Sequence, residues 1–313
     1  MDPRVSILVI SYNTREETLA ALRSVQSETR LPHEIIVVDN ASTDGSAEAI
    51  AEAFPWLRLL AKSHNLGFAA ANNVAAHEAR GEYLLLLNPD TVTRHNAVDR
   101  LVAFADSTPD ARIWTGRTTF SDGRLNPGSC FRRMSLWTLA CGAIGLNSLF
   151  RGSAIFNSEH YGGWKRDSER EIDIAQGSFF LIRREDWEVL GGFDTAFFMY
   201  GEETDLCLRA RKQLGARPRF TPAAEIVHLG GASEAVRSDK MVRLLKAKQE
   251  LITRHFPKWQ QPIAAVLLRG WPWSRQAGLR IAARLTGRDS LKTKAATWKE
   301  IHDRREEWRD GFS

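Results

Sequence analysis

Short apolar runs recur along the first hundred positions of the chain, separated by segments with the composition of helices. The runs span residues 5–10, 34–39, 57–61 and 83–87. They lack a regular alternation of apolar and polar positions, which is typical of strands buried on both faces of a mostly parallel sheet. Helix-start signals follow the first two runs, for example at Asn13-Thr14. The pattern predicts repeated βαβ units and hence an α/β fold of the doubly wound kind.

The rest of the chain divides by composition into two further parts. Residues 111–232 are less regular, with scattered glycine and proline, a half-apolar stretch at residues 135–150 and a helix-like segment at residues 203–214. Residues 233–313 have the composition of helices throughout. We therefore expect three parts, at residues 1–110, 111–232 and 233–313, with the second built onto the sheet of the first.

The charge of the chain is unevenly distributed. Up to residue 234 there are 25 Lys and Arg against 30 Asp and Glu, whereas residues 235–313 have 18 against 8. This basic part also holds five of the ten tryptophans: Trp259, Trp271, Trp273, Trp298 and Trp308. Between residues 263 and 285 apolar side chains are interleaved with Arg269, Arg275, Arg280 and Arg284. Such a helix is typical of one that lies on an anionic membrane surface, the alternative being a solvated helix packed on the body of the protein.

Other features exclude several classes of protein. No run approaches the roughly 20 apolar residues of a bilayer-spanning helix, and the start does not resemble a signal peptide, so we expect a cytoplasmic location. Neither a GxGxxG fingerprint nor a GxxxxGK[ST] loop is present, which argues against a dehydrogenase and a P-loop nucleotidase. The three cysteines suggest no disulfide framework. No recognisable nucleic-acid-binding motif accompanies the basic part, so nucleic acid is not an expected partner.

Polar clusters follow the predicted strands, at residues 11–13, 39–44 and 88–90. In open α/β sheets ligands bind at the carboxyl ends of the strands, so we expect a site there. Asp39 is suited to accept a hydrogen bond from a base or ribose, and Asp90 to bind a hard divalent cation. His228 ends another apolar run. It is a candidate metal ligand if a carboxylate such as Asp90 lies nearby, and otherwise a structural histidine.

Three carboxylates crowd at Glu202, Glu203 and Asp205, after a loop rich in glycine and aromatic residues. Acids in the first turn of a helix are favoured by the helix dipole, which accounts for one or two of them. The preceding loop has no such explanation. We expect it to frame a pocket that limits hydration, and so to raise the pKa of a carboxylate enough for it to act as a general base.

Six motifs in this order resemble those of the inverting family 2 glycosyltransferases with the GT-A fold. The nearest branch is rhamnosyltransferase-like and builds bacterial cell-surface polysaccharides. The resemblance spans residues 5–233, about three quarters of the chain. The motifs are residues 5–13 (VSILVISYN), 38–46 (VDNASTDGS), 65–68 (NLGF), 88–90 (NPD), 191–194 (GGFD) and 201–209 (GEETDLCLR).

The resemblance implies a Rossmann-like, mostly parallel sheet flanked by helices, to which the basic helical tail is added. It also implies a divalent metal, Mg²⁺ or Mn²⁺, held by Asp90 and His228, and Glu203 as the catalytic base. The implied nucleotide-sugar site consists of Ser11, Tyr12, Asn13, Asp39, Asn40, Asn65, Gly67, Asn88 and Asp90. The implied acceptor side consists of Gln176, Gly177, Tyr200 and Glu202.

Two positions depart from the family pattern. Asn88 offers an amide where relatives have the first carboxylate of a D-x-D motif, so the metal would depend on Asp90, His228 and the diphosphate. Glu203 stands where relatives have the aspartate of an E-D pair, and its longer side chain leaves Glu202 or Asp205 as alternative bases. Asp205 is more simply explained as a residue that stabilises the start of the helix.

The function implied by the resemblance is transfer of rhamnose from dTDP-rhamnose, with inversion, to a polyprenyl-linked glycan. The basic tail then places the protein peripherally on the inner face of the cytoplasmic membrane. One alternative is the same reaction with a UDP-hexose or UDP-N-acetylhexosamine, since nothing near Asp39 separates thymine from uracil. The other is a catalytically silent, membrane-associated scaffold that keeps the fold.

Overall fold

The computed structural model describes residues 2–230 and 237–312. The chain divides into two compact units, of which the first comprises residues 1–131 and 165–232 and the second residues 132–164 and 233–313. Residues 132–164, expected in the middle part, thus group with the tail. The predicted boundary at residues 232 and 233, which is also the end of the family resemblance, lies outside the described residues. It stays a prediction that residues 1–110 bind the nucleotide sugar, that residues 111–232 bind the acceptor and hold the catalytic base, and that the helical tail at 233–313 associates with a membrane.

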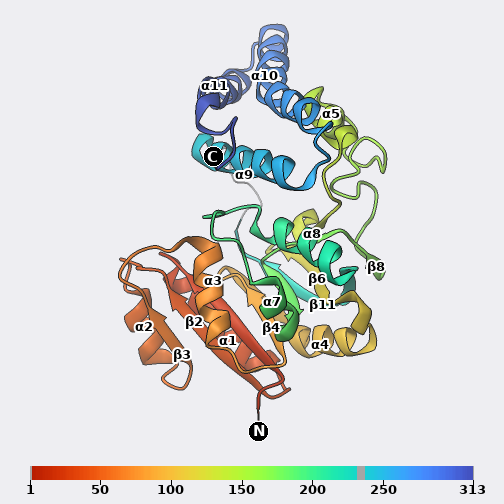
Figure 1. Ribbon diagram of the computed structural model, residues 1–313. Helices are drawn as coiled ribbons and strands as arrows, with labels where there is room; N and C mark the ends of the chain where they lie inside the picture. Colours follow the sequence, from red (N-terminus) through yellow and green to blue (C-terminus); the bar gives the residue numbers. More distant parts are fainter. Residues whose placement is uncertain (1, 231–236, 313) are drawn as a thin grey trace. The chain divides into compact units, whose positions relative to one another are not determined.

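A nine-stranded sheet forms the centre of the first unit, with the strand order β3-β2-β1-β4-β10-β6-β11-β5 and β8 paired to β11 (Figure 1). Strands β3, β2, β1 and β4 are parallel, whereas β10 runs antiparallel to both of its neighbours. Its strands are β1 (Val5–Ser11), β2 (His33–Asp39), β3 (Arg58–Ala61), β4 (Tyr83–Leu87), β5 (Thr91–Arg94), β6 (Ile113–Phe120), β8 (Arg170–Glu171), β10 (Phe179–Arg183) and β11 (Arg219–His228). The four predicted runs match the first four strands to within one residue at either end.

Helices cover both faces of this sheet. Side chains of α1, α2 and α4 belong to one buried cluster with the sheet, while α3 packs on β1 and β2 outside that cluster, and α7 packs on β10. The helices are α1 (Arg15–Glu28), α2 (Ser46–Ala53), α3 (Gly67–His77), α4 (Ala97–Ser107), α7 (Arg184–Leu190) and α8 (Glu202–Leu214). A separate two-stranded sheet pairs β7 (Cys130–Phe131) with β9 (Ile174–Ala175).

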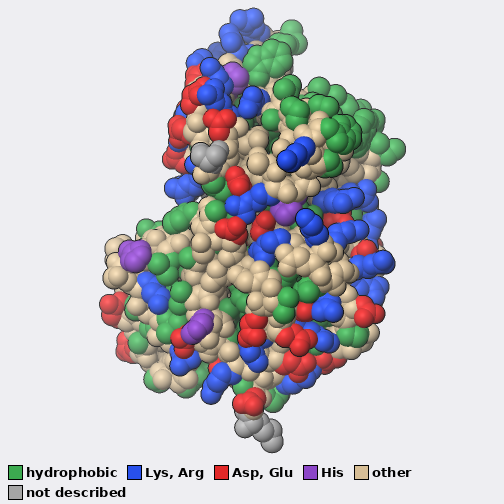
Figure 2. Space-filling view, in the orientation of Figure 1, with side chains coloured by type: hydrophobic (Ala, Val, Ile, Leu, Met, Phe, Trp, Pro, Cys, Tyr) green, Lys and Arg blue, Asp and Glu red, His purple; other side chains and the backbone are tan. Residues whose placement is uncertain are grey.

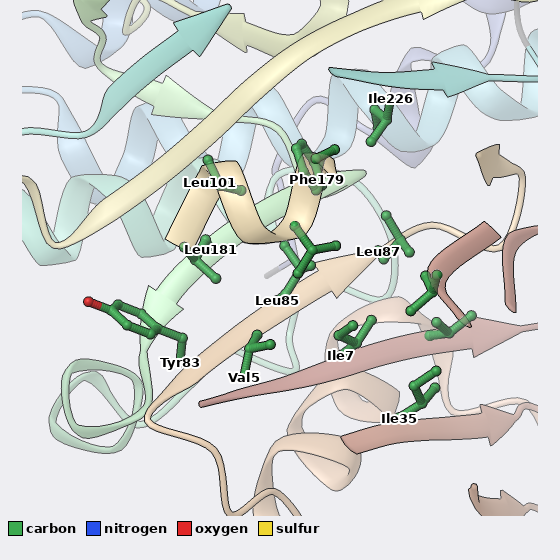
Figure 3. Packing of buried hydrophobic residues seen from close by; sticks show 14 of the residues in the cluster. Val5, Ile7, Ile35, Tyr83, Leu85, Leu87, Leu101, Phe179, Leu181 and Ile226 are labelled. Carbon is green, nitrogen blue, oxygen red and sulfur yellow. The ribbon is translucent and has the colours of Figure 1, made fainter. Parts of the chain in front are cut away.

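Alternate positions of the central strands form the core of the first unit. Val5, Ile7 and Val9 of β1 are fully buried, as is Leu85 of β4 beside them. Figure 3 shows Val5, Ile7 and Leu85 packed with Leu101 of α4 and with side chains of β10 and β11. Because both faces of these strands are covered by helices, every position can be apolar, which explains the unbroken runs in the sequence.

The second unit is helical. It comprises α5 (Leu136–Ala143), α6 (Leu146–Leu149), α9 (Ser238–His255), α10 (Gln261–Thr286) and α11 (Asp289–Asp303). Its core joins Leu139 of α5 to Leu245, Leu268 and Trp298 of the other three long helices, and Trp308 is buried with them. In the part of the chain that the structure describes, no helix is long and apolar enough to cross a membrane.

Candidate active site

The carboxyl ends of β1, β2 and β4 meet at one edge of the sheet. Ser11 is the register partner of Asp39, and the backbone N–H of Asn40 donates to the carbonyl of Ser11 at 2.8 Å. Strand β4 lies on the other side of β1 and ends at Leu87, directly before Asn88. The three polar clusters predicted from the sequence therefore occupy adjacent positions, as expected of a parallel sheet.

Asp39 is buried at this edge, with 2% of its surface exposed. Its Oδ2 accepts a hydrogen bond from the backbone N–H of Ser42 at 3.0 Å. Its Oδ1 is also buried, and no group in the described part of the chain donates to it. A buried carboxylate oxygen without a donor is costly unless a ligand supplies one. Tyr12, which directly follows the end of the neighbouring strand β1, is 48% exposed and offers an aromatic face.

Several other predicted nucleotide-sugar residues brace the loops at this edge. Asn13 adopts a left-handed conformation with φ 53°, and its Oδ1 accepts from the backbone N–H of Thr43 at 2.8 Å. Oδ1 of Asn40 accepts a hydrogen bond from the backbone N–H of Leu66 at 2.8 Å, and Nδ2 of Asn40 donates to Oδ1 of Asn65 at 3.0 Å. The hydroxyl of Ser11 lies 3.0 Å from that of Thr18. These side chains are engaged within the protein, so their effect on a ligand is to set the backbone that surrounds it.

Gly67 connects this turn to the loop before α8. Its φ is +80°, and a Cβ built on it would lie 2.5 Å from the carbonyl oxygen of Phe198. The N–H of Phe68 donates to that same carbonyl at 2.8 Å. Any other residue at position 67 would push the Phe198 loop away, so Gly67 is required for the close approach.

The antiparallel strand β10 brings a second segment to the same edge. Because it runs opposite to β4, its first residue, Phe179, pairs with Leu87, and the preceding residues 176–178 lie beside Asn88. The N–H of Asn88 donates to the carbonyl of Ser178 at 3.2 Å. Gly177 is buried against the ring of Phe68, whereas Gln176 is partly exposed, and its Oε1 accepts from the N–H of Ser178 at 3.1 Å. The structure thus places predicted acceptor-side residues next to predicted donor-side ones.

Asp90 and His228 lie together, although 138 positions separate them. Strand β11 ends at His228, which is paired with Thr91 at the start of β5, and the N–H of Leu229 donates to the carbonyl of Asp90 at 2.8 Å. Nε2 of His228 lies 3.5 Å from Oδ1 of Asp90. Nδ1 lies 3.0 Å from the carbonyl oxygen of Gly230. In the tautomer in which Nδ1 donates to that carbonyl, the lone pair of Nε2 is available to bind a cation beside Asp90.

These two side chains suit a hard divalent cation that also binds ligand oxygens. Mg²⁺ in particular is usually held by one or two protein groups together with phosphates and water. Gly230 is part of this arrangement, because a Cβ there would lie 2.7 Å from Oδ2 of Asp90. Among the residues that the structure describes, no three His, Cys, Asp or Glu side chains gather to form a metal site of their own. The pair therefore fits a cation only in company with a ligand such as a diphosphate.

The carboxylates of α8 differ in their surroundings. Asp205 is buried and its Oδ2 lies 2.6 Å from Nε of Arg209, whose guanidinium also donates to the carbonyls of Leu190 and Gly192 at 2.7 and 2.8 Å. Asp205 and Arg209 thus tie α8 to the end of α7. The backbone before α8 is left-handed at Tyr200 (φ 74°) and Gly201 (φ 96°), and such conformations in non-glycine residues concentrate at functional sites.

Glu202 and Glu203 lie close enough to influence each other. Glu202 is 3% exposed, and its Oε2 has no hydrogen-bond donor in the described part of the chain. Burial, and then the adjacent charge of Glu203, hold the pKa of Glu202 well above its ordinary value. Burial also raises the pKa of Glu203, against hydrogen bonds from backbone amides, but Glu203 keeps part of its surface exposed. Both carboxylates cannot easily ionise together, and burial disfavours the charged form most at Glu202, which has almost no exposed surface.

The burial of Glu202 predicts an unusual dependence of stability on pH. The raised pKa means that the folded chain binds this proton more tightly than the unfolded chain. The contribution of Glu202 to the free energy of unfolding is therefore fully present below its ordinary pKa, and it is lost as pH rises through the raised pKa. Glu202→Gln removes this titration, so its melting temperature is expected to exceed that of the wild type near pH 8 and to match it near pH 4.

Thermal unfolding followed by circular dichroism at both pH values measures this difference. Glu48→Gln, a change of the same kind at an exposed position of α2, serves as the matched control and is expected to shift neither melting temperature. A Glu202→Gln variant that is less stable than the wild type at both pH values would show that the carboxylate makes a stabilising interaction in its ionised form.

Three supporting residues were not identified from the sequence. Gly230 leaves room for Asp90, Phe198 covers Gly67, and Arg209 links α8 to the glycine pair after α7. The signals were present, since Gly230 follows His228 closely and Arg209 lies one helical turn after Asp205. Their contacts, however, join segments far apart in the chain, so no local pattern assigns these roles.

Comparisons with known proteins identify the family of this chain. A family model described as "Glycosyl transferase family 2" matches residues 6–190, more than half of the chain. The chain is 25% identical over 301 residues to the N-acetylglucosaminyl-diphospho-decaprenol L-rhamnosyltransferase of Mycobacterium tuberculosis H37Rv, covering 91% of this chain and 94% of the relative. It is also 25% identical over 234 residues to rhamnosyltransferase WbbL of Escherichia coli K12, covering 72% and 83%.

Solved structures share the fold. The mannosyltransferase PcManGT from Pyrobaculum calidifontis, in complex with GDP-Man and Mn²⁺, superposes with a TM-score of 0.58 at 20% sequence identity. The superposition covers 98% of this chain and 88% of the mannosyltransferase. Together with the central sheet and its flanking helices, this similarity confirms the predicted GT-A fold and the helical C-terminal part.

Proposed function

Because the chain belongs to glycosyl transferase family 2 and is a glycosyltransferase, we propose that it transfers rhamnose from dTDP-rhamnose to a polyprenyl-diphosphate-linked glycan, with inversion. The rhamnosyltransferases of M. tuberculosis and E. coli support the choice of sugar, and the first of them, by its name, acts on a decaprenyl-diphosphate-linked sugar. The observation that carries the proposal is the unsatisfied Oδ1 of Asp39 on the same sheet edge as the Asp90 and His228 pair.

The nucleobase is proposed to bind at Asp39. Thymine and uracil each present a ring N–H, which donates to the free Oδ1, whereas a carboxylate has nothing to donate to the ring acceptor of adenine or cytosine. Tyr12 offers an exposed ring on which the base can stack, while Asn13, Asn40, Asn65 and Gly67 shape the backbone around it.

The donor diphosphate is proposed to lie at Asn88 and Asp90. Asp90 and His228 are the residues that would hold a divalent cation, Mg²⁺ or Mn²⁺, against its oxygens. When bound, that cation supplies positive charge to the departing nucleoside diphosphate. The uncharged Asn88 amide contributes donors to phosphate oxygens in place of a second carboxylate.

Glu203 is proposed as the general base. Its partial exposure lets it reach the acceptor hydroxyl, and the proton held by Glu202 leaves Glu203 as the ionised member of the pair. The acceptor oxygen attacks the anomeric carbon as the bond from that carbon to the diphosphate breaks, and Glu203 takes the hydroxyl proton. One displacement inverts the configuration and needs no second carboxylate on the opposite face of the sugar.

The acceptor is proposed to approach from the side of Gln176, Gly177, Tyr200 and Glu202. The backbone of this loop is left-handed at Tyr200, and Gly177 leaves room for the ring of Phe68 beside it. A polyprenyl-linked acceptor lies in a membrane, so the protein is proposed to work as a peripheral protein on the inner face of the cytoplasmic membrane. The basic charge of residues 235–313 supports this location.

Donor binding tests the proposed function directly. Purified protein is expected to bind dTDP-rhamnose selectively over UDP-glucose, UDP-galactose and UDP-N-acetylglucosamine in calorimetry, and more tightly with Mn²⁺ or Mg²⁺ than with EDTA. Asp39→Ala is expected to weaken binding about tenfold or more, because a charge-assisted hydrogen bond in a buried site is lost. Glu48→Ala on the exposed face of α2 is the control. Selective binding of a UDP-sugar would identify a different donor, and binding of none would contradict the proposal.

A further inference from the structure

Exposed apolar side chains are concentrated in the second unit. Of the sixteen large hydrophobic residues that are exposed in the described part of the chain, eleven belong to it, although it has little more than a third of the residues. Figure 2 shows hydrophobic side chains gathered over α5 and the segment that follows it. Monomeric soluble proteins rarely expose apolar patches of this extent without a binding role. The concentration therefore calls for a partner specific to this unit.

Helix α10 has two apolar faces. One packs in the core, through Ala264, Leu268, Pro272 and Ala283. The other is exposed and consists of Ile263, Val266, Trp273, Ile281 and Leu285, which are between 46% and 81% exposed. At about 100° of rotation per residue, these five share an arc of about 120° on the side opposite the core. Arg269 and Arg280, both exposed, border this arc.

The segment from α5 to residue 156 extends this exposed stripe. Ala143, at the end of α5, lies against Gly270 in the middle of the stripe, where an added Cβ would be 3.9 Å from its Cβ. Arg275 of α10 donates to Oδ1 of Asn147 in α6 at 2.8 Å. The exposed apolar residues of this segment are Trp137, Ile144, Leu149, Phe150 and Ile155. We call the ten exposed residues of the stripe and the segment the apolar face.

The two segments that form the apolar face carry charge of one sign. Residues 136–158 and α10 contain five arginines and not a single Asp or Glu. Arg151 and Arg275 are near neighbours, and burial, then the charge of Arg151, lower the pKa of Arg275. Two guanidinium groups in proximity are favourable when an anion lies between them, and phosphate is the anion they bind best.

We propose that the apolar face docks on an anionic phospholipid bilayer, with its aliphatic and aromatic side chains in the interfacial region and its arginines on lipid phosphates. A broad apolar surface built from segments that carry only basic charge matches a bilayer of this kind, which is apolar below its headgroups and negative at its surface. This inference deepens the proposed function and rests on it, because docking on a membrane would bring the enzyme to the proposed lipid-linked acceptor.

The docking surface differs from the one predicted from the tail sequence. Trp298 and Trp308 are buried in the core of the second unit, and Trp271 packs against it, so these three cannot enter a membrane in this fold. The half-apolar stretch at residues 135–150 instead supplies four of the ten residues of the apolar face. Arginines and apolar residues of α10 alone would give a narrower surface.

Flotation of the full-length protein with phosphatidylcholine vesicles, with and without phosphatidylglycerol, tests the docking. The wild type is expected to float with phosphatidylglycerol vesicles. Ile144→Glu with Leu149→Glu is expected to weaken binding about tenfold or more, since charged groups replace two side chains that insert. The matched control is Val189→Glu, an equally exposed apolar residue of the first unit. Arg151→Gln is expected to reduce the preference for phosphatidylglycerol, whereas Arg23→Gln is not.

The readouts separate this inference from the proposed function. Flotation is measured without donor, and the variants are expected to bind dTDP-rhamnose as the wild type does, because the nucleotide residues lie in the first unit. If the double variant unfolds at a lower temperature, Leu285→Glu, at a position 81% exposed, provides the same test at the last turn of α10. Undiminished flotation of the folded variants would overturn the proposal. So would a wild-type dimer, detected by light scattering, that the double variant abolishes while neither floats.

Discussion

Replacing Glu203 with Gln is expected to lower the rate of sugar transfer by about 10²–10⁴-fold while leaving donor affinity nearly unchanged. The amide keeps the shape of the side chain but cannot take the acceptor proton. Donor affinity is spared because the groups proposed to bind the nucleotide are on β1, β2 and β4, not on α8. The measurement is the transfer rate at saturating donor, set beside the calorimetric dissociation constant of dTDP-rhamnose.

The pH profile provides an independent readout of the same residue. Burial raises the pKa of Glu203 above its ordinary 4.5. A general base acts only when deprotonated, so the wild-type rate is expected to fall as pH decreases through this raised pKa, and the residual rate of Glu203→Gln is expected to lack that limb. The matched comparison is Glu202→Gln, which mimics the protonated acid and should retain most of the activity.

Other outcomes would reassign the pair. Equal losses of transfer and of donor affinity in Glu203→Gln would mean that the carboxylate has a structural role. Activity that survives in Glu203→Gln and disappears in Glu202→Gln would make Glu202 the base. Asp205 is the least suited of the three, since Arg209 already binds its carboxylate at 2.6 Å.

Replacing Asp90 with Ala is expected to weaken Mn²⁺-dependent donor binding about 100-fold, and to leave the weaker binding measured in EDTA almost unaffected. Asp90 is the only carboxylate of the Asn88-Pro89-Asp90 motif, so no neighbouring acid in that motif can replace it. His228 remains as one candidate ligand, but a single imidazole is a poor site for a hard cation. Calorimetry of dTDP-rhamnose with Mn²⁺ and with EDTA measures both values.

Gly230→Ala offers a control that keeps every candidate ligand. The added methyl group would lie 2.7 Å from Oδ2 of Asp90, so the carboxylate must shift, and an intermediate loss of Mn²⁺-dependent affinity is expected. Gly152→Ala, at a glycine with open space around it and without a left-handed φ, controls for the mutation itself. Donor affinity that is unchanged by Asp90→Ala in the presence of Mn²⁺ would remove Asp90 from the metal site.

Some of the fold could be predicted because the responsible forces are local. The strands at β1, β2, β3 and β4 were predicted because residues such as Val9 and Leu85 belong to unbroken apolar runs of strand length. The antiparallel insertion of β10 between β4 and β6 could not be predicted in this way. Its pairing partners lie many residues away, and a short apolar strand looks the same whichever neighbour it joins.

The βαβ start of the chain, the family motifs and the residue types proposed for the chemistry can all be recognised in the sequence, because helix and strand periods and turn residues act over a few positions. Which groups meet depends on the tertiary fold. The pairing of β11 with β5 brings His228 to Asp90. Unequal burial gives the adjacent Glu202 and Glu203 different environments, with Glu202 almost fully covered and Glu203 partly exposed. Packing of α5, α9 and α11 on α10 likewise determines which tryptophans are buried and which apolar residues remain exposed. Burial depends on what covers a residue, and that information is spread over the whole chain.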